Sequence, residues 1–290
     1  MNRQKSNIKR YTRSKVGNFF YFTVLFAAGL FTILPLIYSV ITSFKPLDEL
    51  LAFPPRFYVV RPTLSNYTAL PGLISKLSVP LSRYIFNSLL VSILTTVLHV
   101  IVAAMAAFVL TQWKGNRLIA ALFVIVQFSL LYNATTLGVP QYLIFSKLGI
   151  IDTYWVYILP AIPSSMGAFL IKQYVDSGVP DTIMEAARID GANVFVIYWR
   201  IIMPMIKPAW MTQLLFSFQG IWSITPTAGT VFSENLKTLP YVMGSVSAGG
   251  TARSGAAMAC TVLLMLPPIL VYFVSQSNVM ETMGSAGIKE

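Results

Sequence analysis

A polar stretch interrupts a chain in which 56% of the residues are hydrophobic and only 11% are charged. Residues 185–204 read EAARIDGANVFVIYWRIIMP and carry a glutamate, an aspartate and two arginines. Carboxylates can act as general acids or bases, but a catalytic site needs a pair that converges on one substrate. The other acids are scattered, apart from Asp48 and Glu49, which we interpret as the solvated start of a loop. The sequence therefore predicts no catalytic residues and disfavours a membrane enzyme acting on lipid-linked sugar.

The sequence also lacks the residues that would bind a nucleotide or a metal ion. GTARSGAA, from Gly250, has the glycine spacing of a phosphate loop, but Ala256 and Ala257 stand where lysine and serine or threonine are required. His99 is the single histidine, and one imidazole does not make a metal site. We expect His99 to be hydrogen-bonded to a neighbouring helix and Cys260, the single cysteine, to be a packing residue. The chain is predicted to bind no metal and no cofactor.

The elements that position the polar stretch are expected to be membrane-spanning helices. Apolar runs of spanning length recur, and they are continuous rather than alternating, which favours helices over a barrel. We predict an all-α polytopic membrane protein with six spans, at 19–44, 84–110, 118–138, 153–173, 206–228 and 255–276. The expected organisation is a basic tail at 1–18, a six-helix membrane domain at 19–276 and a second tail at 277–290.

The positive charges predict the orientation. The net charge is +11, and six basic residues crowd into the first fifteen positions: Arg3, Lys5, Lys9, Arg10, Arg13 and Lys15. A basic flank beside an apolar span is typical of the cytoplasmic side, facing anionic lipid, rather than of nucleic-acid binding. Both termini are therefore predicted to be cytoplasmic. No Asp or Glu lies deep in a predicted span, which disfavours the main alternative, an ion-coupled secondary transporter.

The polar stretch is expected to form an elbow of two helices. Pro180 suits a helix start, Gly191 suits a helix end, and Asn193 can cap a second helix that stops at Pro204. Glu185 and Arg188 are three residues apart, so they can pair on the helix surface.

Two interpretations of this elbow are open. An amphipathic loop on the lipid headgroups explains its aromatic residues, Phe195, Tyr198 and Trp199. A docking surface for a soluble partner also explains the nearly bare helix surface at Ala186 and Ala187.

The order of residues in the elbow resembles the EAA loop of bacterial ABC importer permeases. The matching positions are Glu185, Ala186, Ala187, Gly191, Ile201, Met203 and Pro204, with methionine in place of the family's usual leucine before the proline. The segments RYIFNSLLVS and AGIKE are also similar to carbohydrate permeases related to the smaller membrane subunit of the maltose system.

This resemblance implies a type I ABC importer permease fold with a coupling loop at 179–205. The residues that would contact an ATP-hydrolysing subunit are Glu185, Ala186, Ala187, Arg188, Asp190, Gly191 and Pro204. Glu185 would pair with a basic residue of that subunit, both alanines would enter its cleft, and Gly191 would make the turn. The implied partners in a bacterial inner membrane are a homologous second permease, two ATP-binding subunits that hold ATP and Mg²⁺, and an extracytoplasmic solute-binding protein.

The implied substrate is a sugar or oligosaccharide, although a non-sugar solute remained open. Candidates for the substrate path, each equally compatible with bonding between helices, are Gln127, Tyr132, Asn133, Ser164, Ser165, Gln219 and Trp222. The external segments hold eight basic residues against four acids, which leaves an acidic oligosaccharide open beside lipid headgroups or the binding protein. By resemblance, the loop at 229–254 would project toward that binding protein, with a merely flexible loop as the alternative.

Overall fold

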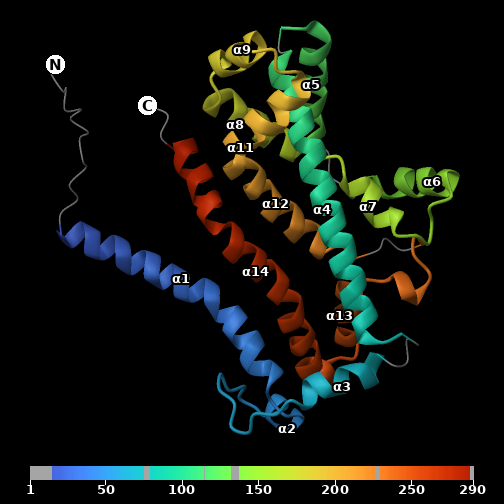
Figure 1. Cartoon of the computed structure of the whole chain (residues 1–290). Helices are drawn as coiled ribbons and strands as arrows, with labels where there is room; N and C mark the ends of the chain where they lie inside the picture. The colour runs from blue at the N-terminus through green and yellow to red at the C-terminus, as the bar shows by residue number, and fades with distance from the viewer. Residues whose placement is uncertain (1–14, 75–78, 114, 132–136, 226–228, 288–290) are drawn as a thin grey trace.

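The computed structural model describes residues 15–74, 79–113, 115–131, 137–225 and 229–287, and these are helical with no strands among them. Three helices, α4 (Leu81–Gln112), α12 (Lys207–Trp222) and α14 (Ser254–Gly287), form the body of an elongated bundle (Figure 1). The others are α1 (Lys15–Ser43), α2 (Leu47–Leu50), α3 (Ser65–Ile74), α5 (Arg117–Ser129), α6 (Gly138–Leu148), α7 (Trp155–Ala161), α8 (Ser165–Gly178), α9 (Asp181–Ile189), α10 (Val194–Val196), the π-helix η3 (Ile197–Ile202), α11 (Met203–Met205), η4 (Glu234–Leu236), α13 (Leu239–Ser247) and η5 (Thr251–Arg253).

Four of these helical segments are long and apolar enough to cross a membrane. They are Val16–Ser43, Leu81–Gln112, Trp155–Gly178 and Thr251–Met280, and the bent pair Val194–Met205 with Lys207–Trp222 makes a fifth if counted as one span. The expected all-helical membrane fold is confirmed, but the count of six spans is not. The predicted third span, 118–138, contains α5, whose 13 residues reach only about 20 Å.

Two predicted boundaries differ from the structure. The fifth span was placed at 206–228, but α12 ends at Trp222 and is entered through a bend of 79°. The sixth was expected to end at 276, yet α14 runs on to Gly287 through the predicted C-terminal tail. Hydropathy marks where a helix leaves an apolar environment, and polar residues can continue the same helix beyond that point.

The main hydrophobic cluster lies at the end of the bundle that carries α9. Three alanines of α4, Ala103, Ala104 and Ala107, are almost fully buried there against Ile171 and Val175 of α8. Small residues let helices approach closely, and close approach gives van der Waals contact where lipid removes the hydrophobic driving force between helices. This tight packing makes a firm base for the elbow.

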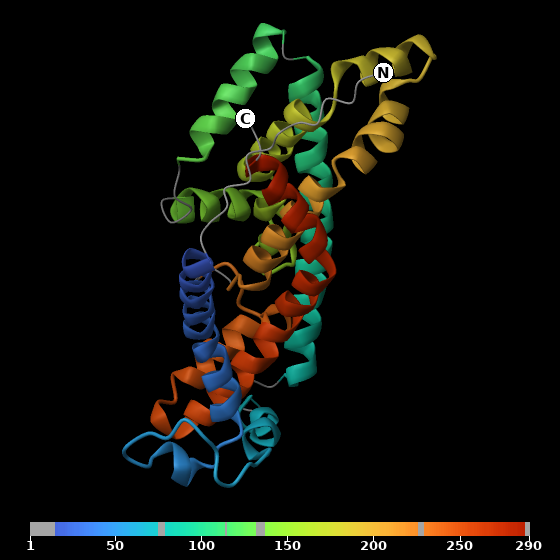
Figure 2. The ribbon, with the colours of Figure 1, turned by 90° about the vertical axis from the view of Figure 1, so that its left-hand side faces the viewer.

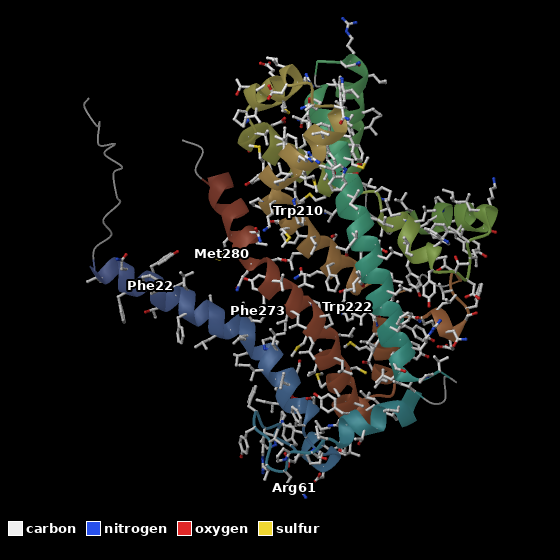
Figure 3. All side chains as sticks on the ribbon, viewed as in Figure 1. Phe22, Arg61, Trp210, Trp222, Phe273 and Met280 are labelled. Carbon is white, nitrogen blue, oxygen red and sulfur yellow. The ribbon has the colours of Figure 1, made fainter. Side chains whose placement is uncertain are left out.

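Helix α1 stands apart from the bundle for most of its length. None of the residues in its most apolar window is buried within this chain, and Phe19, Phe20 and Phe31 are among its exposed side chains. Figure 1 shows its N-terminal part leading away from α14, so that this part lies toward the viewer in Figure 2, and Phe22 lies on it in Figure 3. In a membrane protein such a surface faces lipid or another subunit.

The segment 229–254 is folded onto the bundle instead of forming a flexible loop. Leu239, Val242 and Val246 of α13 are buried. Asn87 of α4 donates to the carbonyl oxygens of Asn235 and Lys237, at 2.7 and 2.8 Å. These contacts lie at the end of α4 far from α9 (Figure 1).

Asp152, which lies just before α7, is hydrogen-bonded to the same segment. Its Oδ1 accepts hydrogen bonds from the backbone N–H groups of Phe232 and Ser233, each at 2.9 Å, and its Oδ2 accepts the Ser233 hydroxyl. Asp152 has a φ of 58°, in the left-handed region that few residues other than glycine adopt. These hydrogen bonds, above all those from Ser233, hold the pKa of Asp152 below its ordinary value of 3.8.

Candidate functional site

The first half of the elbow has the predicted local structure. Helix α9 begins directly after Pro180 and ends at Ile189. Gly191 has a φ of +77°, and the N–H of Ala192 bonds to the carbonyl of Ala187 at 2.9 Å, which closes the helix end. Asn193 then caps the next helix by accepting from the N–H of Val196 at 2.8 Å. Each of these features follows from residue types within a few positions.

The second half is less regular than expected. After one α-helical turn, residues Ile197–Ile202 form a π-helix, a rare geometry that is frequent at functional sites. The helix does not stop at Pro204, which lies exposed within α11, but bends at Ile206 before α12. The indole of Trp210 donates to the carbonyl of Met203 at 3.0 Å, which gives this carbonyl a partner at the bend.

Helix α9 has two distinct faces. Met184 and Ala187, with 5% and 7% of their surface exposed, pack into the main cluster. The opposite face is formed by the exposed side chains that we call the outer stripe: Thr182, Glu185, Ala186 and Ile189. Ile189 is 86% exposed, an unusual position for a large apolar side chain unless another surface covers it.

The two alanines of the motif therefore do not act together. Ala186 lies in the outer stripe, whereas Ala187 is buried against this chain's own helices. Successive residues on a helix are separated by 100°, so neighbours in sequence often face opposite environments. The expectation that both alanines are available to a partner is therefore wrong for Ala187, whereas Ala186 is exposed and remains a candidate contact.

Arg188 contacts α4 rather than Glu185. Its guanidinium donates to the side-chain oxygen of Gln112, the last residue of α4. Among the described residues no ion pair joins Glu185 to a basic group, so the predicted Glu185–Arg188 pair is not formed. A polar pocket of about 180 Å³ opens between α4 and α9, lined by Thr111, Gln112, Asp181, Met184, Glu185 and Arg188.

The aromatic residues of the elbow divide between two environments. Tyr198 is 4% exposed, and its ring lies 5.4 Å from that of Phe108 in the core. Phe195 is 69% exposed and Trp199 is 41% exposed. A headgroup contact thus accounts for Phe195 and Trp199 only. Asp190, at the exposed C-terminal end of α9, completes the predicted coupling residues.

The predicted substrate-path residues lie on separate elements. Gln127 and Gln219 are exposed, on α5 and α12. Ser164 accepts from the N–H of Gly167 at 2.8 Å, which caps α8, and Ser165 bonds to Ser129. Trp222 is buried in the middle of the bundle (Figure 3), where its indole donates to the carbonyl of Leu264 at 2.8 Å. Tyr132 and Asn133 lie outside the described residues.

Three residues of interest were not singled out from the sequence. Ile189 could have been found, since it lies three positions after Ala186 on the same helix face. Gln112 and Gln213 could not, because their partners are 49 or more positions away in the chain. Gln213 is 4% exposed and bonds to His99, while its own side-chain oxygen has no partner among the described residues.

Comparison with known proteins identifies the family. The model for "Binding-protein-dependent transport system inner membrane component" matches residues 102–283. The inner membrane ABC transporter permease protein YcjP of Escherichia coli K12 is 27% identical, covering 96% of this chain and 98% of YcjP. The multiple sugar-binding transport system permease protein MsmG of Streptococcus mutans is 25% identical, covering 95% and 98%.

The fold has a solved counterpart. A chain from the crystal structure of a bacterial ABC transporter involved in the import of the acidic polysaccharide alginate superposes with a TM-score of 0.73, covering 91% of this chain and 98% of that one, at 22% identity. The fold is thus that of an ABC importer permease, as predicted. The elbow lies within the matched region, and the chain belongs to the family of binding-protein-dependent transport system inner membrane components.

Proposed function

We propose that this chain is one of two homologous membrane subunits of an ATP-driven importer for sugars or oligosaccharides. The observation that carries the proposal is the outer stripe, an exposed surface with Ile189 at its end, on a helix whose opposite side packs through Met184 and Ala187 into the main cluster with residues of α4 and α8. A surface of this kind transmits force to a partner only if its base does not yield.

The partners of the outer stripe are two ATP-binding subunits, which hold ATP and Mg²⁺ and perform the hydrolysis. Glu185 pairs with a basic side chain of one such subunit, since its carboxylate has no ion-pair partner among the described residues of its own chain. Ala186 allows close approach, and Ile189 fills an apolar recess. Gly191 and Pro204, with Arg188 and Asp190, fix the shape of the elbow around this contact.

The membrane arrangement follows from the same contact. The outer stripe faces the cytoplasm, where ATP is available, and the C-terminal end of α14 lies in the same half of the molecule (Figure 1). Both termini are then cytoplasmic. The segment around α13 faces the opposite side, where an extracytoplasmic solute-binding protein delivers the substrate.

The substrate class is supported by relatives such as MsmG, whose name gives a multiple sugar-binding system. The exposed amides Gln127 and Gln219 are the best candidates of the predicted path, because Ser164 and Ser165 are engaged within the chain and Trp222 is buried. Hydrogen-bonding side chains and aromatic faces are the groups that recognise sugars. The second permease supplies the other half of the path.

Uptake by proteoliposomes tests the proposal. The reconstituted complex with binding protein is expected to accumulate a labelled sugar when ATP is supplied to the ATP-binding subunits, with or without a protonophore. Uptake that needs an ion gradient and no ATP would instead show a secondary carrier. ATP-dependent uptake of a non-sugar solute, with no sugar transported, would support ATP-driven import but exclude sugars as the substrate.

A further inference from the structure

Gln112 lies at the point where α4 meets α9. It is the last residue of α4, a helix of 32 residues that extends about 48 Å from the α13 end of the molecule to the elbow. Its side-chain amide is half-buried and touches two residues of α9 at once. The oxygen accepts from Arg188, and the nitrogen donates to the sulfur of Met184.

These two contacts are directional, whereas the apolar packing around them is not. Met184 and Arg188 are four residues apart, so they lie one above the other on the flank of α9 that faces α4. Behind them, Ala187 rests among the apolar side chains of the main cluster, whose α4 members include Ala104 and Ala107. Apolar contact is non-directional, so it specifies the rotation of one helix against another less sharply than a hydrogen bond does.

The described residues next to Gln112 on α4 do not make the same contacts with α9. The pocket between α4 and α9 leaves open space beside Glu185, so close packing does not hold the helix on that side. The neighbouring Thr111 hydroxyl donates within α4, to the carbonyl of Ala107 at 2.9 Å. The end of α4 is closed by its own backbone, from the N–H of Trp113 to the carbonyl of Val109. The Gln112 side chain is thus not needed as a helix cap.

We propose that Gln112 is a positioning residue that sets the rotation of α9 relative to α4, and thereby the angle at which the outer stripe meets the ATP-binding subunit. This inference rests on the proposed function of the stripe. Rotating α9 by a fraction of a turn moves Glu185 away from its partner while leaving the fold of the chain intact.

The test uses the whole reconstituted importer and measures ATP hydrolysed per sugar transported, per assembled complex. Gln112→Arg places a second cation beside Arg188 and is expected to raise this ratio about two- to tenfold, the range for losing one hydrogen bond. Gln112→Ala is expected to shift it in the same direction. Gln173→Ala is the matched control, because Gln173 is an exposed glutamine on α8, and no change is expected.

The exchange variant separates positioning from simple stability. Gln112→Arg combined with Arg188→Gln restores a guanidinium-to-amide contact with the groups reversed, and the ratio is expected to return to within about twofold of wild type.

Two results would overturn the proposal. One is a Gln112→Arg complex that assembles and stays coupled while Glu185→Lys uncouples it, which leaves the proposed function standing. The other is a Gln112→Arg chain that fails to accumulate and is not rescued by the exchange, which makes Gln112 a packing residue. If Glu185→Lys also leaves coupling intact, the proposed function of the stripe fails as well.

Discussion

The side chains of His99 and Gln213 join α4 to α12, with the two Nε2 atoms 2.9 Å apart. An amide nitrogen can only donate, so Nε2 of His99 accepts and its Nδ1–H donates to the carbonyl of Ala161, at 2.7 Å. The imidazole therefore connects α4 both to α12 and to the end of α7. The predicted hydrogen bond from His99 to a neighbouring helix is confirmed.

Removing either partner is expected to destabilise the protein. His99→Leu leaves the buried Gln213 amide nitrogen without the imidazole, with only Ser164 3.5 Å away. Such bonds inside membrane proteins contribute about 0.6–1.7 kcal/mol. We expect His99→Leu and Gln213→Leu each to lower the free energy of unfolding in detergent by about 1 kcal/mol, and the double variant to lose less than the sum. Strictly additive losses would contradict a direct bond.

The side chains of Gln213 and Ser164 leave no room for a side chain at position 167, which is a glycine. A Cβ atom at this position would lie 2.7 Å from both Nε2 of Gln213 and the Oγ of Ser164. Gly167→Ala is therefore expected to lower the free energy of unfolding by about 1–3 kcal/mol, because the neighbours must shift. The matched control is Gly220→Ala on α12, where a Cβ meets nothing within 4 Å and helix propensity favours alanine. Equal melting temperatures for the two variants would contradict this packing.

The two alanines of α9 are predicted to differ. Ala187→Leu overfills the core and is expected to lower the free energy of unfolding by about 1–3 kcal/mol. Ala186→Leu projects outward and is expected to leave the melting temperature of the isolated chain unchanged while reducing co-purification of the ATP-binding subunits. Loss of partner binding by Ala187→Leu in a stably folded chain would show that the faces are assigned the wrong way round.

Asp152 makes the attachment of 229–234 dependent on pH. Its pKa is lowered in the folded state, so its stabilising contribution is present above the ordinary value of 3.8 and is lost as pH falls through the lower folded value. Asp152→Asn tolerates the positive φ but carries no charge. We expect this variant to melt below wild type at pH 7 and the difference to shrink near pH 3. A difference that stays constant with pH would exclude the carboxylate as its source.

The local structure of the elbow could be predicted because its signals are local. Pro180, Gly191 and Asn193 each act within a few residues, and they place α9 and the following cap correctly. The identity of the buried alanine could not be predicted, because it depends on which flank of α9 meets α4. Likewise, the reach of Gln112 to Arg188 exists only after distant segments have packed.

The count of six spans is not confirmed, for a different reason. An apolar run such as 118–138 has the composition of a membrane helix, but composition does not show where the chain turns. Helix α5 ends at Ser129, and α6 begins at Gly138. Similarly, Trp222 has the residue type of a sugar-binding group, and only the packing of α12 on α14 shows that it is buried.

The outer stripe is predicted to couple this chain to ATP hydrolysis. The most direct test is the ATPase activity of the reconstituted complex with and without loaded binding protein, alongside sugar uptake, for wild type, Glu185→Lys and Gly191→Pro. Proline cannot adopt the φ of +77° at Gly191, so that variant reshapes the elbow, whereas Glu185→Lys only reverses a surface charge. We predict that both complexes assemble but lose stimulation and uptake together. Normal stimulation and uptake in both assembled variants would contradict the claim.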